Sequence, residues 1–434
     1  METKLLKIAE IARQNPKEKF TSLYHYINKE MLLKCHKQLL GNKATGIDDV
    51  TKQEYSKELD NNIENLAVRL KNQSYKPQAV KRVYISKGEG KTRPLGIPSY
   101  EDKLVQMALN KILQSIYEAD FKDFSYGFRP KRSCHSAIKA LNKVIENGRI
   151  NYVVDADIKG FFNNVNHEWM IKFLEVRISD PNILRLVKKF LKAGLMENGV
   201  LMTTEVGTPQ GGSIVSPTLA NIYLHYSLDL WFEKIIKRDS KGQAEITRYA
   251  DDFVCCFQYE SEARQFCRLL VSRLNKFNLE VEKTKSKLIL FGRFAEETRK
   301  RRGFKNAETF DFLGFTHYCA KSKRGYFRVK RKTSKKKFRA KVKDFNQWIK
   351  SVRNKLRIGD IFKLTKQKLV GHYQYYGITD NSYMIGQFCL EIKKALFKWL
   401  NRRSQRRSFD LDKFKVYMKY NPLPKPKINV NVYR

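Results

Sequence analysis

Two adjacent carboxylates form the most chemically suggestive feature of this chain. Asp251 and Asp252 stand between two short apolar or β-branched arms, residues 246–248 and 253–257, and this pattern predicts a β-hairpin with both acids at its tip. Carboxylates this close repel each other, and a pair of divalent cations would remove that cost and create a site for phosphoryl transfer. Taken alone, an Asp-Asp turn is also typical of a solvated loop.

A third carboxylate for such a site could come from Asp157. It lies near the end of an apolar run, residues 152–158, that predicts a buried strand, where a charge is costly unless it is paired or bound to a metal. Paired metals in such sites lie about 3.5–4 Å apart. Asp155 lies on the same face of this strand, and a structural partnership with a lysine or an amide explains it equally well. Phe161 and Phe162 follow, either as the floor of a nucleotide site or as core.

Two further segments carry groups suited to a phosphate ligand. Lys87 and Arg93 flank a glycine-containing loop after a strand-like run at 80–85, an arrangement that could hold a triphosphate. Ordinary solvated charge is the alternative. Residues 206–212 form a glycine-rich loop in which backbone can approach a ligand closely, and Gln210 offers both a donor and an acceptor. Loops of this kind also serve purely structural ends.

Helices and strands must position these groups. Hydrophobic residues at helical spacing predict helices in four segments, which are 1–40, 52–72, 101–117 and 261–278. Ser216 followed by Pro217 predicts a helix start, with the serine as cap and the proline at the first helical position. Residues 310–315 are strand-like.

The charge of the chain limits its partners. The 434 residues include 86 Lys and Arg against 44 Asp and Glu, a formal net charge of +42 that opposes folding unless a polyanion neutralises it. Nucleic acid is the expected partner. The sequence contains no run of about 18 apolar residues, the length needed to span a membrane. Thirteen of the 23 residues at 321–343 are basic and none is acidic, which places a domain boundary near residue 320.

The seven cysteines indicate a reducing compartment. They are scattered, with no CxxC pair and no Cys/His cluster, so we expect neither disulfides nor structural zinc. No signal peptide is recognisable at the amino end, and the acids Glu2, Glu10 and Glu18 are unusual for a transit peptide. A cytoplasmic location is therefore expected, and an organelle is disfavoured.

Taken in order, these segments resemble a reverse transcriptase, and within that class the group II intron-encoded proteins of bacteria and organelles. The resemblance runs from about residue 40 to 420. The matching segments are 46–48, 87–98, 125–130, 157–162, 208–217, 249–252, 282–286, 312–315 and 371–376. It implies an α+β, right-hand polymerase fold with an antiparallel palm sheet. The implied domains are an amino-terminal extension at 1–75, fingers and palm at 76–320, and a basic helical thumb or maturase domain at 321–434.

The resemblance also implies roles for individual residues. Asp157, Asp251 and Asp252 would be the catalytic carboxylates that coordinate two Mg²⁺ ions, with Mn²⁺ as a possible substitute. The implied dNTP-binding residues are Lys87, Arg93, Phe162, Gln210, Ala250 and Lys285, and the implied template and primer contacts are Gly211, Phe312, Leu313 and Gly314. Phe162 would be the steric gate that selects deoxynucleotides.

The implied function is RNA-directed DNA synthesis of the group II intron type, together with binding of the intron RNA as a splicing maturase. The expected partners are dNTPs, an RNA template, the RNA–DNA duplex and group II intron RNA, with no membrane and an unknown oligomeric state. A domesticated relative without an intron, for example in phage defence, and a non-catalytic RNA-binding maturase remain alternatives. Phe162 disfavours a polymerase of ribonucleotides.

Two departures from the family pattern are visible. Asn163 stands where many relatives have aspartate, next to the gate, so the loss is of a charge and not of a metal ligand. The Cys- and His-bearing endonuclease that many relatives carry after the thumb has no counterpart in residues 421–434. We therefore expect DNA synthesis to survive and second-strand cleavage to be absent.

Overall fold

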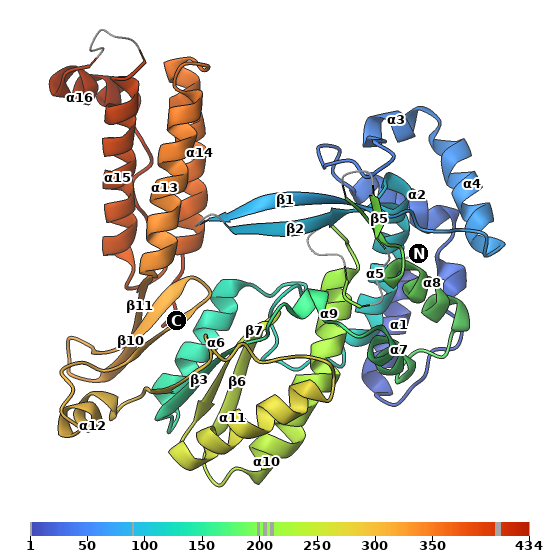
Figure 1. The fold of residues 1–434 in the computed structure, drawn as a ribbon, viewed down its shortest axis with the longest axis horizontal. Coiled ribbons are helices and arrows are strands. Elements are labelled where there is room, and N and C mark those ends of the chain that lie inside the picture. The colour runs from blue at the N-terminus through green and yellow to red at the C-terminus, as the bar shows by residue number, and fades with distance from the viewer. Residues whose placement is uncertain are drawn as a thin grey trace. The chain divides into compact units, whose positions relative to one another are not determined.

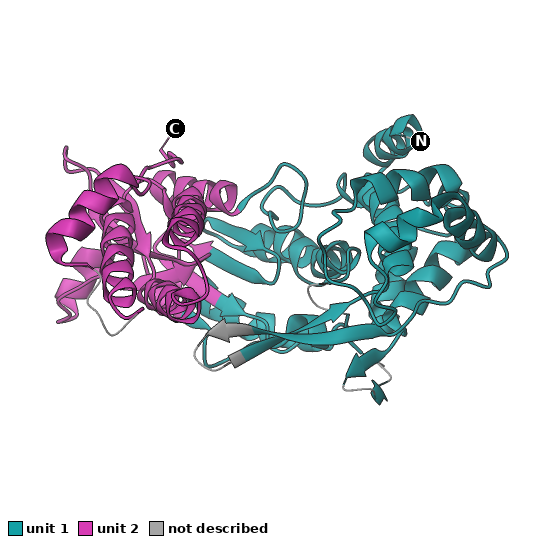
Figure 2. Cartoon of the chain, turned by 90° about the horizontal axis from the view of Figure 1, so that it is seen from above, with its two compact units in different colours: residues 1–133, 156–255, 261–287 teal, residues 134–155, 256–260, 288–434 magenta. Residues whose placement is uncertain are grey.

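A computed structural model describes residues 2–88, 91–197, 200–202, 206–208, 212–403 and 409–433, without the side chains of residues 86–88 and 91. Helices and largely antiparallel sheets make up the fold, which confirms the expected α+β class. The chain divides into two compact units (Figure 2). The first holds residues 1–133, 156–255 and 261–287, and the second holds 134–155, 256–260 and 288–434. The three functional domains expected from the sequence stay a prediction.

The first unit is mainly helical (Figure 1). Its α-helices are α1 (Glu2–Gln14), α2 (Lys29–Gln38), α3 (Lys52–Lys57), α4 (Leu59–Lys71), α5 (Tyr100–Tyr117), α7 (His167–Glu175), α8 (Pro181–Leu191), α9 (Ser216–Leu224) and α10 (Lys237–Asp239), together with α11 (Glu260–Asn275), which begins at the unit boundary. Helix α5 is central to the core, with Leu104, Leu109 and Ile112 fully buried. Ser99 starts it by accepting a hydrogen bond from the Asp102 amide at 3.3 Å.

A four-stranded sheet of the first unit carries the predicted triphosphate loop. Its order is β2-β1-β4-β5, formed by β1 (Val80–Gly88), β2 (Lys91–Ile97), β4 (Leu195–Glu197) and β5 (Val200–Met202). Strands β1 and β2 pair antiparallel with Ile85 opposite Arg93, whereas β4 runs parallel to β1. The strand predicted at 80–85 is therefore confirmed and extends to Gly88.

A second four-stranded sheet carries the acidic residues. Its order is β6-β7-β3-β8, formed by β6 (Ala244–Tyr249), β7 (Asp252–Phe257), β3 (Tyr152–Asp157) and β8 (Lys287–Leu290). Strands β6 and β7 are neighbours joined by only two residues, which confirms the predicted hairpin. Strand β3 lies next to β7, so the buried strand that ends at Asp157 and the hairpin belong to one sheet.

The helix predicted at Ser216-Pro217 forms, but its cap is different. Ser216 is the first helical residue of α9 and makes no cap of its own. Instead Ser213 Oγ accepts hydrogen bonds from the Ser216 amide at 3.2 Å and from the Ser216 hydroxyl at 2.7 Å. Two π-helical segments, η3 (His225–Asp229) and η4 (Phe232–Ile236), continue the chain after α9. Such π segments are frequent near functional sites.

The second unit combines a small sheet with long helices (Figure 1). Its elements are α6 (Cys134–Asn147), α12 (Ala295–Arg301), β9 (Thr309–Phe312), β10 (Phe315–Lys321), β11 (Phe327–Thr333), α13 (Lys335–Val352), α14 (Ile358–Tyr376), α15 (Ser382–Leu400) and α16 (Leu411–Tyr420). The three strands pair antiparallel in the order β11-β10-β9. One apolar core joins the long helices, with Ile349, Ile361, Leu396 and Phe315 among its buried members.

The strand-like segment at 310–315 is strand at 310–312 and at 315, but a turn interrupts it. Strand β9 ends at Phe312 and β10 begins at Phe315, so Leu313 and Gly314 form the turn. Both have positive φ, 49° and 80°, a backbone conformation that strands do not use.

Within the described residues, no helix is long and apolar enough to cross a bilayer.

Candidate active site

The turn between β6 and β7 consists of Ala250 and Asp251. Tyr249 ends β6 and Asp252 begins β7, so the two carboxylates occupy the tip of the hairpin, as the sequence predicted. Ala250 has φ +57° and is only 6% exposed. A left-handed conformation costs an L-residue about 1–2 kcal/mol, and the surrounding contacts must supply that energy.

Asp157 lies within electrostatic reach of Asp251. Burial raises the pKa of the Asp251 carboxyl, the negative charge of Asp157 raises it further, and the positive charges of Arg93 and Arg248 oppose both effects. The structure therefore brings together two of the three predicted carboxylates and one predicted triphosphate-binding residue. Because Asp251 is costly to ionise, a cation at this position would be strongly favoured.

Lys285 contacts the same carboxylate. Its Nζ lies 2.7 Å from Asp157 Oδ2, and this hydrogen bond raises the pKa of the lysine. The backbone fixes the approach, since the Glu282 amide donates to the Asp157 carbonyl at 2.8 Å and the Lys159 amide donates to the Glu280 carbonyl at 2.8 Å. The turn at residues 282–285 is thus tied to the end of β3, which explains why Lys285 reaches the acidic site.

The donor set suits a hard divalent cation. Asp157 and Asp251 offer carboxylate oxygens, the ligands that Mg²⁺ prefers, and their mutual repulsion is the cost that a cation would remove. Among the described residues, no three His, Cys, Asp or Glu side chains gather as a preformed metal centre. The roles of Asp157, Asp251 and Asp252 as joint metal ligands therefore stay a prediction.

A buried arginine lies beneath the acidic turn. Arg248 is fully buried, and its guanidinium donates to the two Asp229 carboxylate oxygens at 2.7 and 2.5 Å and to Asn221 Oδ1 at 3.0 Å. It also donates to the Ala250 carbonyl at 2.9 Å. Burial raises the pKa of Asp229, and the Arg248 charge opposes that rise. The ion pair therefore anchors the turn that carries Asp251.

The segment at 125–130 also contacts the turn and the residues that hold it. The Tyr126 amide donates to the Arg248 carbonyl at 2.8 Å, and Asn221 Nδ2 donates to the Gly127 carbonyl at 2.7 Å. A Cβ added at Gly127 would lie 2.3 Å from the Ala250 amide nitrogen. No side chain larger than hydrogen fits there, so the glycine is required by close backbone packing.

Arg248, Asp229, Asn221 and Gly127 were not singled out as site residues from the sequence. One signal was present, because Asp229 lies between Leu228 and Leu230 in an apolar helical run, where an acid needs a buried partner. Nothing in the sequence identified Arg248 as that partner. The contact joins residues 19 positions apart, on different elements.

Phe161 and Phe162 differ in how far their side chains are exposed to solvent. Phe161 is 1% exposed and belongs to the core, whereas Phe162 is only partly buried in the short helix η2 (Phe161–Asn163). The Phe162 carbonyl accepts a hydrogen bond from the Thr208 amide at 2.7 Å. Gly207, at φ +90°, leaves no room for a Cβ, which would lie 3.0 Å from the same carbonyl. The glycine-rich loop is thus fastened to the turn that presents Phe162.

Three predicted residues are only partly accounted for. Gln210 and Gly211 lie outside the described residues, and so does the Lys87 side chain. Arg93 is exposed on β2. Its positive charge acts to lower the pKa of Asp251 in the acidic turn. The nucleotide-binding roles of Lys87, Arg93 and Gln210 and the template or primer contact of Gly211 stay predictions.

The predicted primer contacts lie in the second unit. Phe312 is buried, and the turn at Leu313 and Gly314 is held by the aromatic segment at 371–376. Tyr375 donates its hydroxyl to the Leu313 carbonyl at 2.8 Å, and a Cβ at Gly314 would lie 3.2 Å from the Tyr376 hydroxyl. The two motifs therefore form one structural unit around the hairpin bend.

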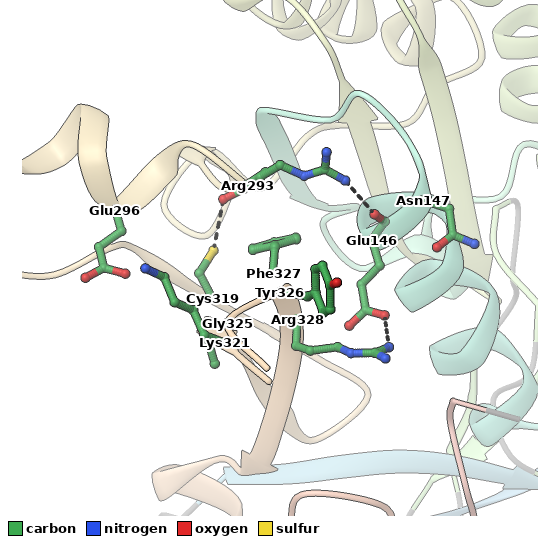
Figure 3. A pocket seen from close by; sticks show the side chains of 12 residues that line it. Glu146, Asn147, Arg293, Glu296, Cys319, Lys321, Gly325, Tyr326, Phe327 and Arg328 are labelled. Atoms are coloured by element: carbon green, nitrogen blue, oxygen red, sulfur yellow. Dashed lines mark hydrogen bonds and ion pairs between the residues drawn. The ribbon is translucent and has the colours of Figure 1, made fainter. Parts of the chain in front are cut away.

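The second unit also contains a cavity of about 540 Å³ that no sequence motif indicated (Figure 3). It is lined by Glu146, Asn147, Gly292, Arg293, Glu296, Cys319, Ala320, Lys321, Gly325, Tyr326, Phe327 and Arg328. Glu146 accepts hydrogen bonds from Arg328 at 2.9 Å and from the Val329 amide at 2.7 Å, so this carboxylate is already neutralised. The cavity mixes both signs of charge and indicates no single ligand class.

Comparison with known proteins places the chain in a family. A family model described as reverse transcriptase (RNA-dependent DNA polymerase) matches residues 85–317. The group II intron-encoded protein LtrA of Lactococcus lactis subsp. cremoris is 42% identical over 248 residues, which cover 56% of this chain and 40% of that protein. Protein YkfC of Escherichia coli is 33% identical over 315 residues, which cover 64% of this chain and 82% of that protein.

A third relative agrees in kind. An uncharacterised 91 kDa protein in the cob intron of Schizosaccharomyces pombe is 40% identical over 181 residues, covering 42% of this chain and 22% of that protein. The matched part of this chain spans less than half of LtrA, so the activities of the whole relative do not transfer directly. The chain belongs to the reverse transcriptase family of RNA-dependent DNA polymerases and is homologous to group II intron-encoded proteins.

Proposed function

We propose that this protein copies RNA into DNA, joining dNTPs to the 3′-hydroxyl of a primer paired with an RNA template. The observation that carries the proposal is the 2.7 Å contact of Lys285 with Asp157, together with the charges of Asp157 and Arg93 that act on Asp251, inside the family-matched region. Phosphoryl transfer is catalysed mainly by positioning and charge. Carboxylates that can bind metal ions, with basic side chains near them, provide both.

The carboxylates would hold two Mg²⁺ ions. Asp157 and Asp251 are the ligands that the electrostatics support, and Asp252, the first residue of β7, would be the third. Bound metal would lower the pKa of the primer hydroxyl and neutralise the leaving pyrophosphate. Arg248 and Asp229 would keep the Asp251 turn in place during the reaction.

The remaining residues would bind the nucleotide. Lys87 and Arg93, on the β1–β2 hairpin, would hold the triphosphate, and Gln210 would contact the nucleotide from the glycine-rich loop. Lys285 stays protonated well above neutral pH because Asp157 raises its pKa, so it would balance negative charge near the pyrophosphate. Ala250 would pack beneath the primer end.

The test is primer extension on an RNA template with dNTPs and Mg²⁺. Asp251→Ala should abolish extension, because the site loses a carboxylate that no neighbour can replace. Asp60→Ala, which removes an exposed acid on α4, is the matched control and should extend normally. Undiminished synthesis by Asp251→Ala would refute the site.

The predicted role of Phe162 as a steric gate is tested by comparing the incorporation of ribonucleotides and deoxyribonucleotides. Phe162→Ala should admit ribonucleotides, because the partly exposed ring would no longer exclude a 2′-hydroxyl. The measurement is incorporation of single rNTPs against dNTPs at matched concentrations. If the ratio does not change in a folded variant, another residue selects the sugar.

A second role, binding of a group II intron RNA as a splicing maturase, is favoured by the 42% identical relative LtrA, which is a group II intron-encoded protein. The bacterial relatives also favour a cytoplasmic location. This role would be supported if the DNA around the gene encodes a group II intron ribozyme, and if the RNA of that intron splices faster with the protein than without it. Its absence would leave a polymerase without an intron, as in a domesticated enzyme.

A further inference from the structure

Two short segments of the first unit are joined beside Phe162, and we call residues 162–166 and 206–208 together the gate clamp. Three backbone contacts join the segments, which are the antiparallel bridge of Asn166 with Val206, the hydrogen bond from the Gly207 amide to the Val165 carbonyl at 2.8 Å, and the hydrogen bond from the Thr208 amide to the Phe162 carbonyl at 2.7 Å. The gate clamp therefore fixes the backbone from which the Phe162 side chain extends.

One side chain is added to these backbone contacts. His167 is the first residue of α7, and its Nε2 lies 2.8 Å from the Gly207 carbonyl oxygen. A carbonyl oxygen can only accept, so Nε2 carries the proton and donates. His167 Nδ1 is buried with no hydrogen-bond partner among the described residues, and burial lowers the pKa of the imidazole by more than the bond to Gly207 raises it. The ring is therefore neutral, with its one donor on Gly207.

Packing holds the loop at 206–208 from one direction only. Gly207 has φ +90°, and a Cβ on it would lie 2.9 Å from the Asn163 carbonyl oxygen, so this backbone already touches the turn that follows Phe162. The same loop also borders a cavity of about 170 Å³, which it lines together with Arg82, Phe190 and Leu195. A segment beside a cavity has fewer packing contacts than one in a close-packed core. Hydrogen bonds must therefore supply much of what keeps the loop in place.

The start of α7 does not explain the His167 contact. That helix is already capped, because the Asn166 side chain accepts a hydrogen bond from the Trp169 amide at 2.9 Å. Histidine is also only a moderate helix former, so the first helical position gains little from it. The imidazole instead reaches out of the helix to a loop 40 positions later in the chain. Its effect therefore falls on the gate clamp.

We propose that His167 is a positioning residue for sugar selection. By holding the Gly207 carbonyl it keeps the gate clamp closed, and the closed clamp keeps the Phe162 ring where it excludes the 2′-hydroxyl of a ribonucleotide. The inference rests on the proposed function, because it takes Phe162 as the gate. His167 itself does not have to touch the nucleotide. A displacement of about 1 Å near reacting groups is enough to change catalysis strongly, so a small opening of the clamp should show in the choice of sugar.

The test is incorporation of single nucleotides by the full chain on an RNA template with a DNA primer. The measured quantity is the kcat/KM for an rNTP divided by that for the matching dNTP. His167→Leu keeps a side chain of moderate size and removes the donor, and the ratio should rise about tenfold, which corresponds to about 1.4 kcal/mol. A variant that only lost folded protein would lose activity with both sugars equally. A merely structural role of His167 would therefore leave the ratio unchanged.

Two conservative variants locate the donor. The amide nitrogen of glutamine can take the place of histidine Nε2, whereas that of asparagine lies closer to the backbone and takes the place of Nδ1. His167→Gln should therefore keep the sugar ratio near that of the unmodified protein, and His167→Asn should raise it as His167→Leu does. The matched control is His135→Leu in the second unit, where His135 Nε2 lies 2.7 Å from the Tyr375 carbonyl oxygen. Loss of this similar contact should not change the ratio.

A double variant shows whether His167 acts through Phe162. Phe162→Ala/His167→Leu should admit ribonucleotides no more readily than Phe162→Ala alone, because the ring that His167 positions is gone. A further rise in the double variant would mean that His167 acts by another route, and it would refute the proposal. An unchanged or lowered ratio in folded His167→Leu would refute it as well. If His167→Leu does not fold, His167→Asn carries the same comparison.

The outcomes separate this inference from the proposed function. If the unmodified protein does not extend a primer with dNTPs, the proposed polymerase fails. If Phe162→Ala leaves the sugar ratio unchanged, the proposed gate fails and the role of His167 fails with it. If Phe162→Ala raises the ratio and folded His167→Leu does not, only the role of His167 is refuted.

Discussion

Arg248 in the first unit and Arg353 in the second show two ways of burying a guanidinium. Arg248 is fully buried, and hydrogen bonds reach Asp229, Asn221 and the Ala250 carbonyl. Arg353 buries two nitrogens, Nε and Nη1, with no partner among the described residues. One guanidinium is completed by the protein itself, and the other is left incomplete.

The difference separates a buried charge that the protein satisfies from one that it leaves partly unsatisfied among the described residues. A buried ion pair with all its hydrogen bonds fixes local geometry, and at Arg248 the geometry it fixes is that of the acidic turn. An incomplete charge costs stability until a partner of opposite sign arrives. Asp251 belongs with Arg353 in this respect, since burial and Asp157 both disfavour its ionised form.

The largest effect should follow from breaking the complete pair. Arg248→Ala leaves the Asp229 carboxylate buried without its partner, and breaking such a pair costs about 3–5 kcal/mol. We expect a loss of that size in the free energy of unfolding, measured by urea denaturation, and no detectable primer extension. A variant as stable as the unmodified protein would show that the pair does not hold the turn.

A double variant separates the effect of the Arg248–Asp229 charges on stability from the effect of Arg248 on the position of the turn. Arg248→Met/Asp229→Leu removes both charges, and replacing a buried pair by apolar side chains is often neutral for stability. It should therefore unfold at a denaturant concentration closer to that of the unmodified protein than Arg248→Ala does. Primer extension should stay low, because the Ala250 carbonyl has lost its donor. Full extension by the double variant would mean that the donor is dispensable.

The next effect tests the packing under the turn. Gly127→Ala places a Cβ 2.3 Å from the Ala250 amide, so the turn must shift, at a cost of about 1–3 kcal/mol. Extension should fall more than binding of the template–primer. Gly386→Ala on α15 is the matched control, since a Cβ there meets nothing within 4 Å and alanine favours a helix by about 0.5–1 kcal/mol. Equal effects of the two changes would contradict the close packing.

The hairpin and the strands were predictable because they depend on local patterns. Apolar arms around a two-residue turn gave β6 and β7, and the apolar run at 152–158 gave β3. The prediction failed where local patterns were ambiguous. Residues 310–315 are apolar enough for one strand, but Leu313 and Gly314 adopt positive φ as the two-residue turn between β9 and β10, and Tyr375 donates a hydrogen bond to that turn.

The candidate site was predictable in its reacting groups and not in its support. Asp251 and Lys285 carry chemistry that their residue types reveal. Arg248 lies one residue before Tyr249 in a strand arm, and no local pattern links it to its partner Asp229, which belongs to a separate helical segment. Long-range pairs between buried charges leave no local pattern, and only the fold shows which charges are matched.

The smallest effect should be a gain in stability. Asp251→Asn keeps the shape of the side chain and removes a charge that the folded state disfavours, so we expect unfolding to be harder by about 1 kcal/mol near neutral pH, while primer extension is lost. A carboxyl with a raised pKa binds protons more readily in the folded state. Its stabilising contribution is therefore complete only below the pKa of the unfolded chain and is lost as pH rises through the raised value.

This pH dependence distinguishes an incomplete charge from an ordinary surface acid. The advantage of Asp251→Asn in melting temperature should be greatest near neutral pH and should disappear as pH falls below the ordinary range of a carboxyl. Mg²⁺ should raise the melting temperature of the unmodified protein more than that of the variant, because a ligand stabilises only the state that binds it. If Asp251→Asn is less stable at neutral pH, Asp251 is a balanced structural acid like Asp229, and the contrast between complete and incomplete charges does not extend to the active site.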